Sequence, residues 1–281
     1  MRVFGLLVLL FSFPLLAKIQ MTTQIQEIDF GQHIGDEILV LLKNGRVGKL
    51  KRADALILDH MQLKGNQEWF KITMDKNRYI THITNTDSPQ QEVVDTYVLN
   101  NKSEYIPTTI ENMTVAKKYF RELPYNPKDS QCFNRAMVWT YEWWKNHSLK
   151  SNKILIFFTR NYIRRYNFEW WFHIAPYVHI KQRDGTIVER AMDRKYSSGP
   201  ITFRKWTDTF MRNNAECPVI TRYSEFADYP YSGECYIIRT NMYTYQPADL
   251  QMNEAWGYNK DKFNMLEVKG AYLEAFDISM K

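Results

Sequence analysis

Two extended runs joined by a short turn, at residues 169–193, constrain the fold of this chain more than any other feature. The first run, EWWFHIAPYVHIKQ, and the second, GTIVERAMD, are rich in aromatic and β-branched residues, as strands are. Alternate side chains of a strand point to opposite faces. The predicted core face carries Phe172, Ile174, Val178 and Ile180. The other face carries Trp171, His173, Ala175, Tyr177 and His179.

The turn between these runs, QRDGT, determines which residues face each other across the strand pair. A three-residue loop over 183–185 is common when a glycine, here Gly185, takes the left-handed position. This loop places Asp193 opposite Ala175 and makes it a diagonal neighbour of His173 on the same face. A two-residue loop would instead turn Asp193 to the other face. The three-residue loop therefore predicts a His173–Asp193 pair.

The stretch DSQCFNRAMVW, residues 129–139, places Cys132 at the start of a predicted helix. Asp129 or Ser130 is expected to cap this helix. One face of it carries Phe133, Met137, Thr140 and Trp144. The unpaired N–H groups of a first turn, and its positive dipole end, favour a thiolate and can donate to an oxyanion. The alternative interpretation is a small apolar side chain that fills the helix start.

Together, Cys132, His173 and Asp193 fit the division of labour in a thiol acyl-transfer site. A thiolate attacks a carbonyl, a histidine carries the proton, and a carboxylate orients the histidine. A structural histidine on the strand is the alternative for His173 alone. Candidates for the walls of the site are Trp170, Trp171, Tyr177 and His179.

Residues 1–17, MRVFGLLVLLFSFPLLA, are expected to be a signal peptide, with a retained anchor as the alternative, because a basic residue precedes an apolar run that is short for a membrane span. We therefore expect a secreted or periplasmic protein. The chain has three cysteines, and in an oxidising compartment an odd number leaves one unpaired. Cys217 and Cys235 flank a segment containing Tyr, Pro and Gly and form the expected disulfide. Cys132 is then the free thiol.

Three regions are expected after the signal peptide. Residues 18–90 are predicted to form a β-rich module, in which Asn44-Gly45 is a two-residue hairpin turn and 55–63 a further strand. Residues 91–112 are polar and typical of a linker with a processing site. Residues 113–281 begin with a helical stretch and continue with strands and a further helix near 206–213. This order predicts an α+β domain, with the helix of Cys132 packed on an antiparallel sheet.

The formal net charge is +6, and lysine and arginine are spread along the chain without a block longer than KLKR. This pattern favours a solvated basic surface over nucleic-acid binding. No group of histidine, cysteine and carboxylate residues has metal-ligand spacing, so no metal is expected. A catalytically silent binding protein, with its aromatic residues on a binding face, is the alternative from a different class.

Three stretches of this sequence resemble the protein-glutaminases, secreted bacterial enzymes that deamidate glutamine side chains in intact proteins. CFNRAMVW resembles the segment of the family's nucleophile, WWFHIAPYV that of its histidine, and AMDRKYSSGPI that of its acid. The intervals of 41 residues from Cys132 to His173, and of 20 from His173 to Asp193, also fit the family. The resemblance covers residues 130–206 well and the flanks loosely.

The resemblance implies that Cys132 is the nucleophile, His173 the general base and acid, and Asp193 the orienting carboxylate. Its substrates would be proteins with exposed glutamine, converted to glutamate and ammonia through a thioester without a cofactor. The implied core is similar to transglutaminases and papain-like proteases. In the family a pro-segment, here 18–90, covers the active site until proteolysis. The alternatives are transglutaminase-like transfer to a lysine amine, and a cysteine protease.

Overall fold

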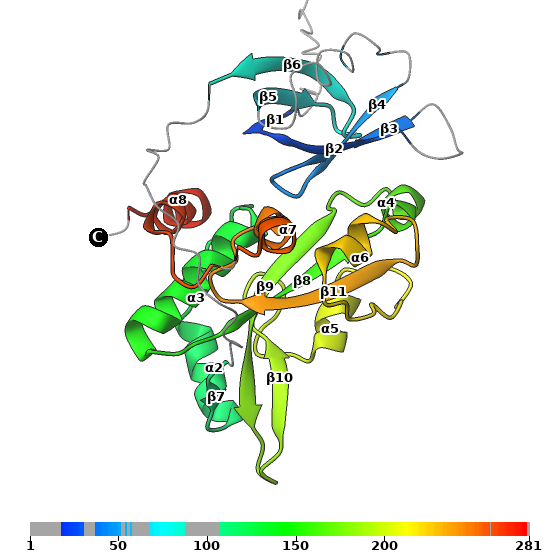
Figure 1. The fold of residues 1–281 in the computed structure, drawn as a ribbon. Coiled ribbons are helices and arrows are strands. Elements are labelled where there is room, and N and C mark those ends of the chain that lie inside the picture. Colours follow the sequence, from blue (N-terminus) through cyan, green and yellow to red (C-terminus); the bar gives the residue numbers. More distant parts are fainter. Residues whose placement is uncertain are drawn as a thin grey trace, which may run out of the picture. The chain divides into compact units, whose positions relative to one another are not determined.

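The computed structural model of the protein describes residues 18–30, 37–51, 54, 57, 68–87, 107–258 and 260–279. The chain divides into two compact units, residues 1–43 with 48–88 and residues 44–47 with 89–281 (Figure 1). The expected signal peptide lies outside the described residues, as do nearly all of the strand expected at 55–63 and most of the expected linker. Within the described ranges, no helix is long and apolar enough to cross a bilayer.

The first unit is a β module, in agreement with the β-rich region that the sequence predicts. Its described strands are β1 (Ile19–Thr23), β2 (Ile25–Asp29), β3 (Glu37–Leu42), β4 (Val47–Lys51), β5 (Trp69–Met74) and β6 (Ile80–Thr86). They form two three-stranded sheets, in the orders β1-β5-β6 and β2-β3-β4. Both sheets contribute to one apolar cluster, which contains Ile25, Ile38, Val40, Leu42, Leu50, Phe70, Ile72, Met74 and Ile80.

The Asn44-Gly45 pair lies in the turn between β3 and β4, as predicted. Gly45 has a φ of 87°, in the left-handed region that glycine adopts without steric cost. The side chain of Asn44 accepts a hydrogen bond from the backbone N–H of Arg46 at 3.1 Å. The strands stop at Leu42 and resume at Val47, so the loop is longer than the predicted two-residue turn.

The second unit is built on an antiparallel sheet with the strand order β10-β9-β8-β11. Its strands are β8 (Asn152–Phe158), β9 (Phe172–Lys181), β10 (Ile187–Ala191) and β11 (Cys235–Asn241). The short strand β7 (Thr109–Ile110) pairs in parallel with the end of β9. Every residue of β8 is buried, and so is every residue of β9 except His179 and Lys181. The predicted α+β class with an antiparallel sheet is confirmed.

The register of β9 and β10 is the one predicted from a three-residue turn. Lys181 pairs with Ile187 and Tyr177 with Ala191. Gly185 takes the left-handed conformation, with a φ of 85°. Just beyond the end of β10, the backbone N–H of Met192 still donates to the carbonyl of Pro176 at 2.9 Å. This register brings the next residue along the chain, Asp193, to the level of the start of β9.

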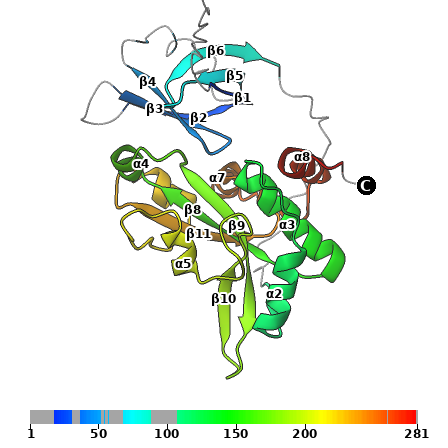
Figure 2. The ribbon, with the colours of Figure 1, turned by 180° about the vertical axis from the view of Figure 1, so that it is seen from behind.

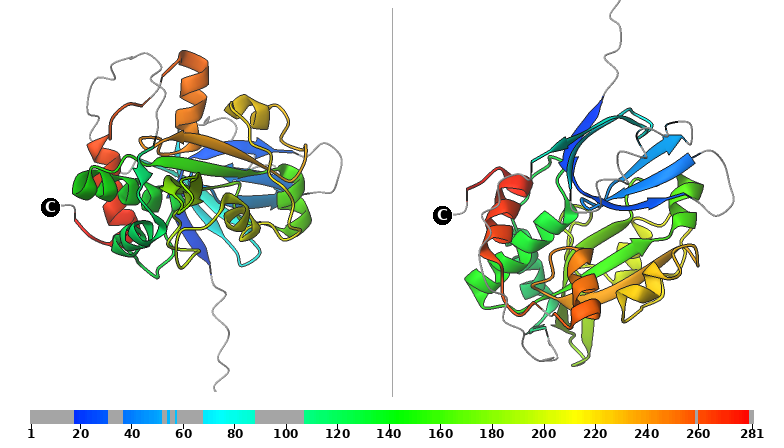
Figure 3. Two further views of the ribbon diagram at one scale, coloured as in Figure 1. Left: turned by 90° about the horizontal axis from the view of Figure 1, so that it is seen from below. Right: turned by 45° about the horizontal axis from the view of Figure 1, so that its top comes forward.

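Three helices enclose the main core of this unit: two pack against β9, and the third packs against the longer of these two. They are α2 (Met113–Glu122), α3 (Cys132–His147) and α8 (Met265–Phe276). Figures 2 and 3 show α3 and α8 side by side. Their shared cluster includes Phe120, Trp139, Trp143, Val178, Tyr272 and Phe276. The remaining helices are α4 (Arg160–Tyr166), α5 (Phe203–Asp208), α6 (Tyr223–Ala227) and α7 (Pro247–Trp256).

Two predictions about helices need correction. The helix expected near 206–213 is α5, which begins and ends earlier because the side chain of Thr202 caps it at Lys205 N. In α3, Phe133, Met137 and Thr140 are buried as expected, but Trp144 is 43% exposed. Nearly every residue from Cys132 to Trp143 is buried, because α3 lies between β9 and α8 and is covered on more than one face.

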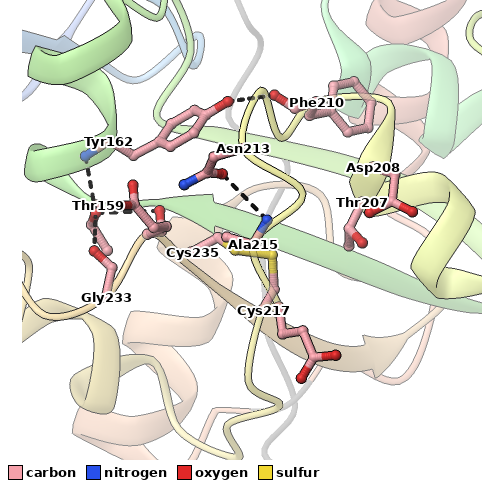
Figure 4. Close-up of a disulfide and its surroundings, with 12 residues drawn as sticks. Thr159, Tyr162, Thr207, Asp208, Phe210, Asn213, Ala215, Cys217, Gly233 and Cys235 are labelled. Carbon is pink, nitrogen blue, oxygen red and sulfur yellow. Dashed lines mark hydrogen bonds between the residues drawn. A yellow bond between two sulfur atoms is a disulfide. The ribbon is translucent and has the colours of Figure 1, made fainter.

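The expected disulfide joins Cys217 to Cys235, with a Cα–Cα distance of 4.9 Å (Figure 4). Cys235 is the first residue of β11. The bridge therefore ties the irregular segment that follows α5 to an edge strand of the sheet. The same segment is held farther upstream by the hydroxyl of Tyr162, which donates to the carbonyl of Phe210 at 2.6 Å.

Removal of this bridge is expected to destabilise the protein. The bond closes a loop across 18 residues, which corresponds to roughly 3 kcal/mol of unfolded-state entropy. The double variant Cys217→Ala/Cys235→Ala should therefore lose about that much free energy of unfolding in urea. The matched control is Cys132→Ala, which removes a buried sulfur without removing a cross-link. Equal unfolding midpoints for the parent and the double variant would contradict the expectation.

Lys153 of β8 belongs to a cluster of buried charged side chains. Lys153 is 0% exposed, and its ammonium donates to the carbonyl of Thr244 at 2.6 Å. Nearby, Lys260 is paired with Asp249 at 2.8 Å and with Glu267 at 2.7 Å. Burial, followed by the positive charge of Lys260, lowers the pKa of Lys153 to about 7, although the two carboxylates act in the opposite direction.

The pKa of Lys153 predicts a pH-dependent stability. Between about pH 7 and the ordinary lysine pKa of 10.5, Lys153 is protonated in the unfolded chain and neutral in the folded chain. The free energy of unfolding therefore rises with pH over this range. Lys153→Met removes the effect. The free energy of unfolding of Lys153→Met minus that of the parent should be highest at and below about pH 7. This difference should decline toward about pH 10, by at most on the order of 5 kcal/mol. Urea unfolding at several pH values measures this. Lys150→Met, at an exposed position, is the control; a pH-independent difference would rule the prediction out.

Candidate active site

Cys132, His173 and Asp193 meet in the second unit, although they lie far apart in the sequence. Cys132 is the first residue of α3, His173 the second of β9, and Asp193 follows β10 by two residues. Nε2 of His173 lies 2.7 Å from Oδ2 of Asp193. His173 also forms a side-chain hydrogen bond with Cys132, and Nδ1 is the ring nitrogen left for the sulfur. The structure thus brings together the three residues that the sequence nominates.

The start of α3 leaves its first turn without a side-chain cap. The N-cap residue is Gln131, and it makes no side-chain capping bond. The expected caps, Asp129 and Ser130, do not serve, because the helix begins later than either of them. By contrast, Asn112 caps α2 and Thr159 caps α4. The N–H groups of the first turn beside Cys132 are therefore not taken up by a capping side chain, and they suit a developing oxyanion.

The carboxylate of Asp193 is held from several sides. Its Oδ2 accepts both His173 Nε2 and the indole N–H of Trp206, the latter at 3.0 Å. Its Oδ1 accepts the backbone N–H of Lys195 at 3.3 Å. The backbone carbonyl of Asp193 accepts from the N–H and the hydroxyl of Ser197, each at 2.9 Å. The three bonds to the carboxylate oxygens fix the rotamer of a side chain that is only 1% exposed, and the bonds from Ser197 hold the backbone beside it.

The charges of the site favour a protonated histidine. Burial lowers the pKa of His173. The negative charges of Asp193 and Cys132 and their hydrogen bonds raise it by more than burial lowers it, so the pKa is about 9. Burial likewise raises the pKa of Asp193, yet the charge and hydrogen bond of His173, the charge of Arg135 and the Trp206 hydrogen bond outweigh it, so the pKa is lowered. At neutral pH the pair is thus an imidazolium and a carboxylate, and the imidazolium lies beside the sulfur.

Aromatic side chains surround the imidazole of His173. The ring of Phe210 lies 4.4 Å from it, that of Trp206 5.7 Å, and that of Tyr196 stands edge-on at 5.2 Å. Tyr196 is 39% exposed and so reaches the surface. These residues could not be recognised from the sequence as neighbours of His173, because they lie in loops or in a short helix without periodicity. A signal was present only for Trp206, since a buried indole N–H requires an acceptor.

The four wall candidates proposed from the sequence make contacts with residues outside the triad. Trp171 is 1% exposed and packs against Phe157 and Phe172. His179 lies 3.8 Å from Glu189 on β10, and Tyr177 accepts a hydrogen bond from Asn152. The guanidinium of Arg46, in the same unit, lies over the ring of Trp170 at 4.7 Å from its centroid. Strand alternation placed Tyr177 and His179 on the face of His173, and both lie farther along β9.

No group of three or more histidine, cysteine or carboxylate side chains with the geometry of a metal site occurs in the part of the chain that the structure describes. The chemistry of this site is therefore inferred from the thiol of Cys132 and the pair of His173 and Asp193.

Comparison with known proteins gives consistent results for this region and for the fold. The model of a family described as Glutaminase matches residues 104–210, a range that contains Cys132, His173 and Asp193. A crystal structure of a pro- protein-glutaminase is similar over 92% of this chain and 94% of its own, with a TM-score of 0.50 and 15% identity. A mutant of a pro- protein-glutaminase gives a TM-score of 0.51 and 15% identity over 90% and 92% of the two chains. No curated protein matches in sequence. The relation to transglutaminases stays a prediction.

Proposed function

We propose that the chain is a protein-glutaminase, which hydrolyses the side-chain amide of protein-bound glutamine to glutamate and ammonia; the match of residues 104–210 to a family described as Glutaminase supports this. The observation that carries the proposal is the position of His173, which is hydrogen-bonded to Asp193 through Nε2 and is also hydrogen-bonded to Cys132. This is the arrangement that nucleophilic acyl transfer by a thiol requires.

The first half of the proposed reaction forms a thioester. The thiolate of Cys132 attacks the amide carbon of the glutamine side chain, and the carbonyl electrons move to oxygen. The first-turn N–H groups of α3 stabilise the resulting oxyanion. As the tetrahedral intermediate collapses, its C–N bond breaks, and the imidazolium of His173 gives its proton to the departing ammonia.

The second half returns the enzyme to its starting state. Neutral His173 takes a proton from water, and the resulting hydroxide attacks the thioester carbon. The C–S bond then breaks, which releases glutamate and regenerates the thiolate beside the imidazolium. Asp193 keeps Nε2 protonated and orients the ring in both halves. A lysine amine in place of water would give transglutaminase-like transfer, and a peptide bond in place of the amide would give proteolysis.

We also propose that the chain is exported and then activated by proteolysis. A solved structure of similar fold is a pro- protein-glutaminase, which supports a pro-segment here. We propose that residues 1–17 direct export, that residues 18–90 are the inhibitory pro-segment, that 91–112 carry the processing site, and that 113–281 are the catalytic domain. The proposed destination is the periplasm or the medium.

The decisive experiment measures ammonia release from an unfolded, glutamine-rich protein by the full chain, before and after limited proteolysis. The expected result is release that increases on proteolysis, together with the mass change that accompanies each conversion of glutamine to glutamate. The same protein previously deamidated to completion is the matched control substrate. Amine incorporation, cross-links or new N-termini without ammonia release would overturn deamidation. Equal activity of the intact and the cleaved chain would overturn the inhibitory pro-segment.

A further inference from the structure

The segment 127–130, which leads into the nucleophile helix, is held by two cations from different elements. The ammonium of Lys195 donates to the carbonyl of Pro127 at 2.8 Å and to that of Lys128 at 3.3 Å. It also lies 3.5 Å from a carboxylate oxygen of Asp129. From the other side, the guanidinium of Arg135 donates to the carbonyl of Ser130 and, at 3.1 Å, to its hydroxyl.

Both cations are largely withdrawn from water. Arg135 is 4% exposed, and the side chain of Lys195 is 15% exposed. Such groups are costly to bury unless they are hydrogen-bonded, and here their partners are mainly backbone carbonyls of one short irregular segment. The segment has no helical or strand structure of its own, and α3 has no side-chain cap. These bonds are therefore well placed to set where Cys132 lies.

Lys195 also contacts the other end of the triad. Its backbone N–H donates to Oδ1 of Asp193 at 3.3 Å, while its side chain holds the carbonyl groups of Pro127 and Lys128. One residue thus connects the carboxylate that orients His173 with the segment that positions the nucleophile. Arg135 likewise acts on both parts of the site. It bonds to Ser130 in segment 127–130, and its charge helps to lower the pKa of Asp193.

We propose that Lys195 and Arg135 are positioning residues of this site: by holding segment 127–130 against the loop of Asp193, they keep Cys132 and the first-turn N–H groups of α3 aligned with His173. The inference rests on the proposed deamidation for its role in turnover, but the alignment of Cys132 with His173 can be measured without a substrate. Loss of alignment should affect the chemical step more than substrate binding, because the groups that move are those that meet the transition state.

The test compares Lys195→Met with Lys195→Arg, which keeps the charge and several donors, and with Lys181→Met, an exposed lysine on β9. Each is assayed as the full chain after the same limited proteolysis. Lys195→Met is expected to lower kcat by about 10- to 100-fold with little change in KM, as small misplacements of reacting groups do. Lys195→Arg should recover most of the loss, and Lys181→Met should match the parent.

A second readout is the rate at which iodoacetamide alkylates Cys132, the free thiol. It should slow in Lys195→Met at neutral pH, because the sulfur moves away from the imidazolium, while every molecule still reacts. The proposal is overturned if kcat and the alkylation rate are unchanged. It is also overturned if only the reactive fraction falls, which indicates unfolding. If the parent releases no ammonia but the alkylation rate still falls in Lys195→Met, deamidation fails and the positioning role stands.

Discussion

Replacement of Cys132 by alanine is expected to reduce ammonia release from protein-bound glutamine by on the order of 10⁵-fold or more, to the level of the blank. In the proposed reaction the thiolate is the protein group that forms a bond to the substrate carbon, so its loss removes the thioester route entirely. Stability should change little, because alanine leaves only a small void at a side chain that is 2% exposed.

The measurement pairs activity with urea unfolding and uses the Cys217→Ala/Cys235→Ala variant as the control. That variant also loses sulfur atoms, and it is expected to lose stability but to keep activity while it is folded. Activity of Cys132→Ala above the blank, in a preparation whose fold is intact, would show that Cys132 is not the nucleophile. Activity lost by both variants to the same degree would point to folding rather than to chemistry.

The second large effect is expected for Asp193→Asn, with a fall in kcat of about 10²- to 10⁴-fold. His173 Nε2 and the indole N–H of Trp206 both approach Oδ2, so the amide oxygen must occupy that position to satisfy them. The amide NH₂ would then face the backbone N–H of Lys195, which approaches Oδ1 at 3.3 Å. Two donors would oppose each other, and the side chain would lose the fixed rotamer that orients His173.

The same variant should shift the pH profile. The pKa of His173 is raised to about 9, and Asp193 is the first of the two groups that raise it. Because the proposed reaction needs imidazolium as the acid, kcat/KM of the parent should fall above about pH 9. Without the carboxylate charge, burial lowers the pKa of His173, so the fall should begin at lower pH in Asp193→Asn.

Steady-state rates across the pH range, with Asp184→Asn as control, test this expectation. Asp184 is an exposed carboxylate in the turn of the same hairpin, and it accepts hydrogen bonds from the backbone N–H and the hydroxyl of Thr186. Its variant should keep the rate and profile of the parent. A basic limb that stays near its original position in Asp193→Asn, or a kcat within a few-fold of the parent, would argue against the role assigned to Asp193.

Much of the site could be predicted because its residues follow local rules. The turn over 183–185 sets the register of β9 and β10 through its length and through Gly185, and this register is enough to bring Asp193 beside His173. The amphipathic pattern after Cys132 predicts that the thiol lies in the first turn of a helix, and Cys132 is the first residue of α3. Spacing and the compartment expected for the chain pair Cys217 with Cys235.

Other features could not be predicted, because they depend on which distant segments pack together. The helix cap is an example: Asp129 and Ser130 have capping side chains, yet segment 127–130 is held instead by Lys195 and Arg135, and α3 begins after Gln131. A cap needs only its own next few residues, whereas these contacts require the loop of Asp193 to be in place.

By itself, the sequence determined the α+β class, the antiparallel hairpin and the identity of the three candidate site residues, because strand alternation, turn length and helix periodicity act over a few neighbouring residues. Only the tertiary structure decided which groups surround them. Phe210, Trp206 and Tyr196 reach His173, and Lys153 is buried with a pKa lowered to about 7. Burial and electrostatic interactions act through space between segments far apart in the chain, and no local pattern records them.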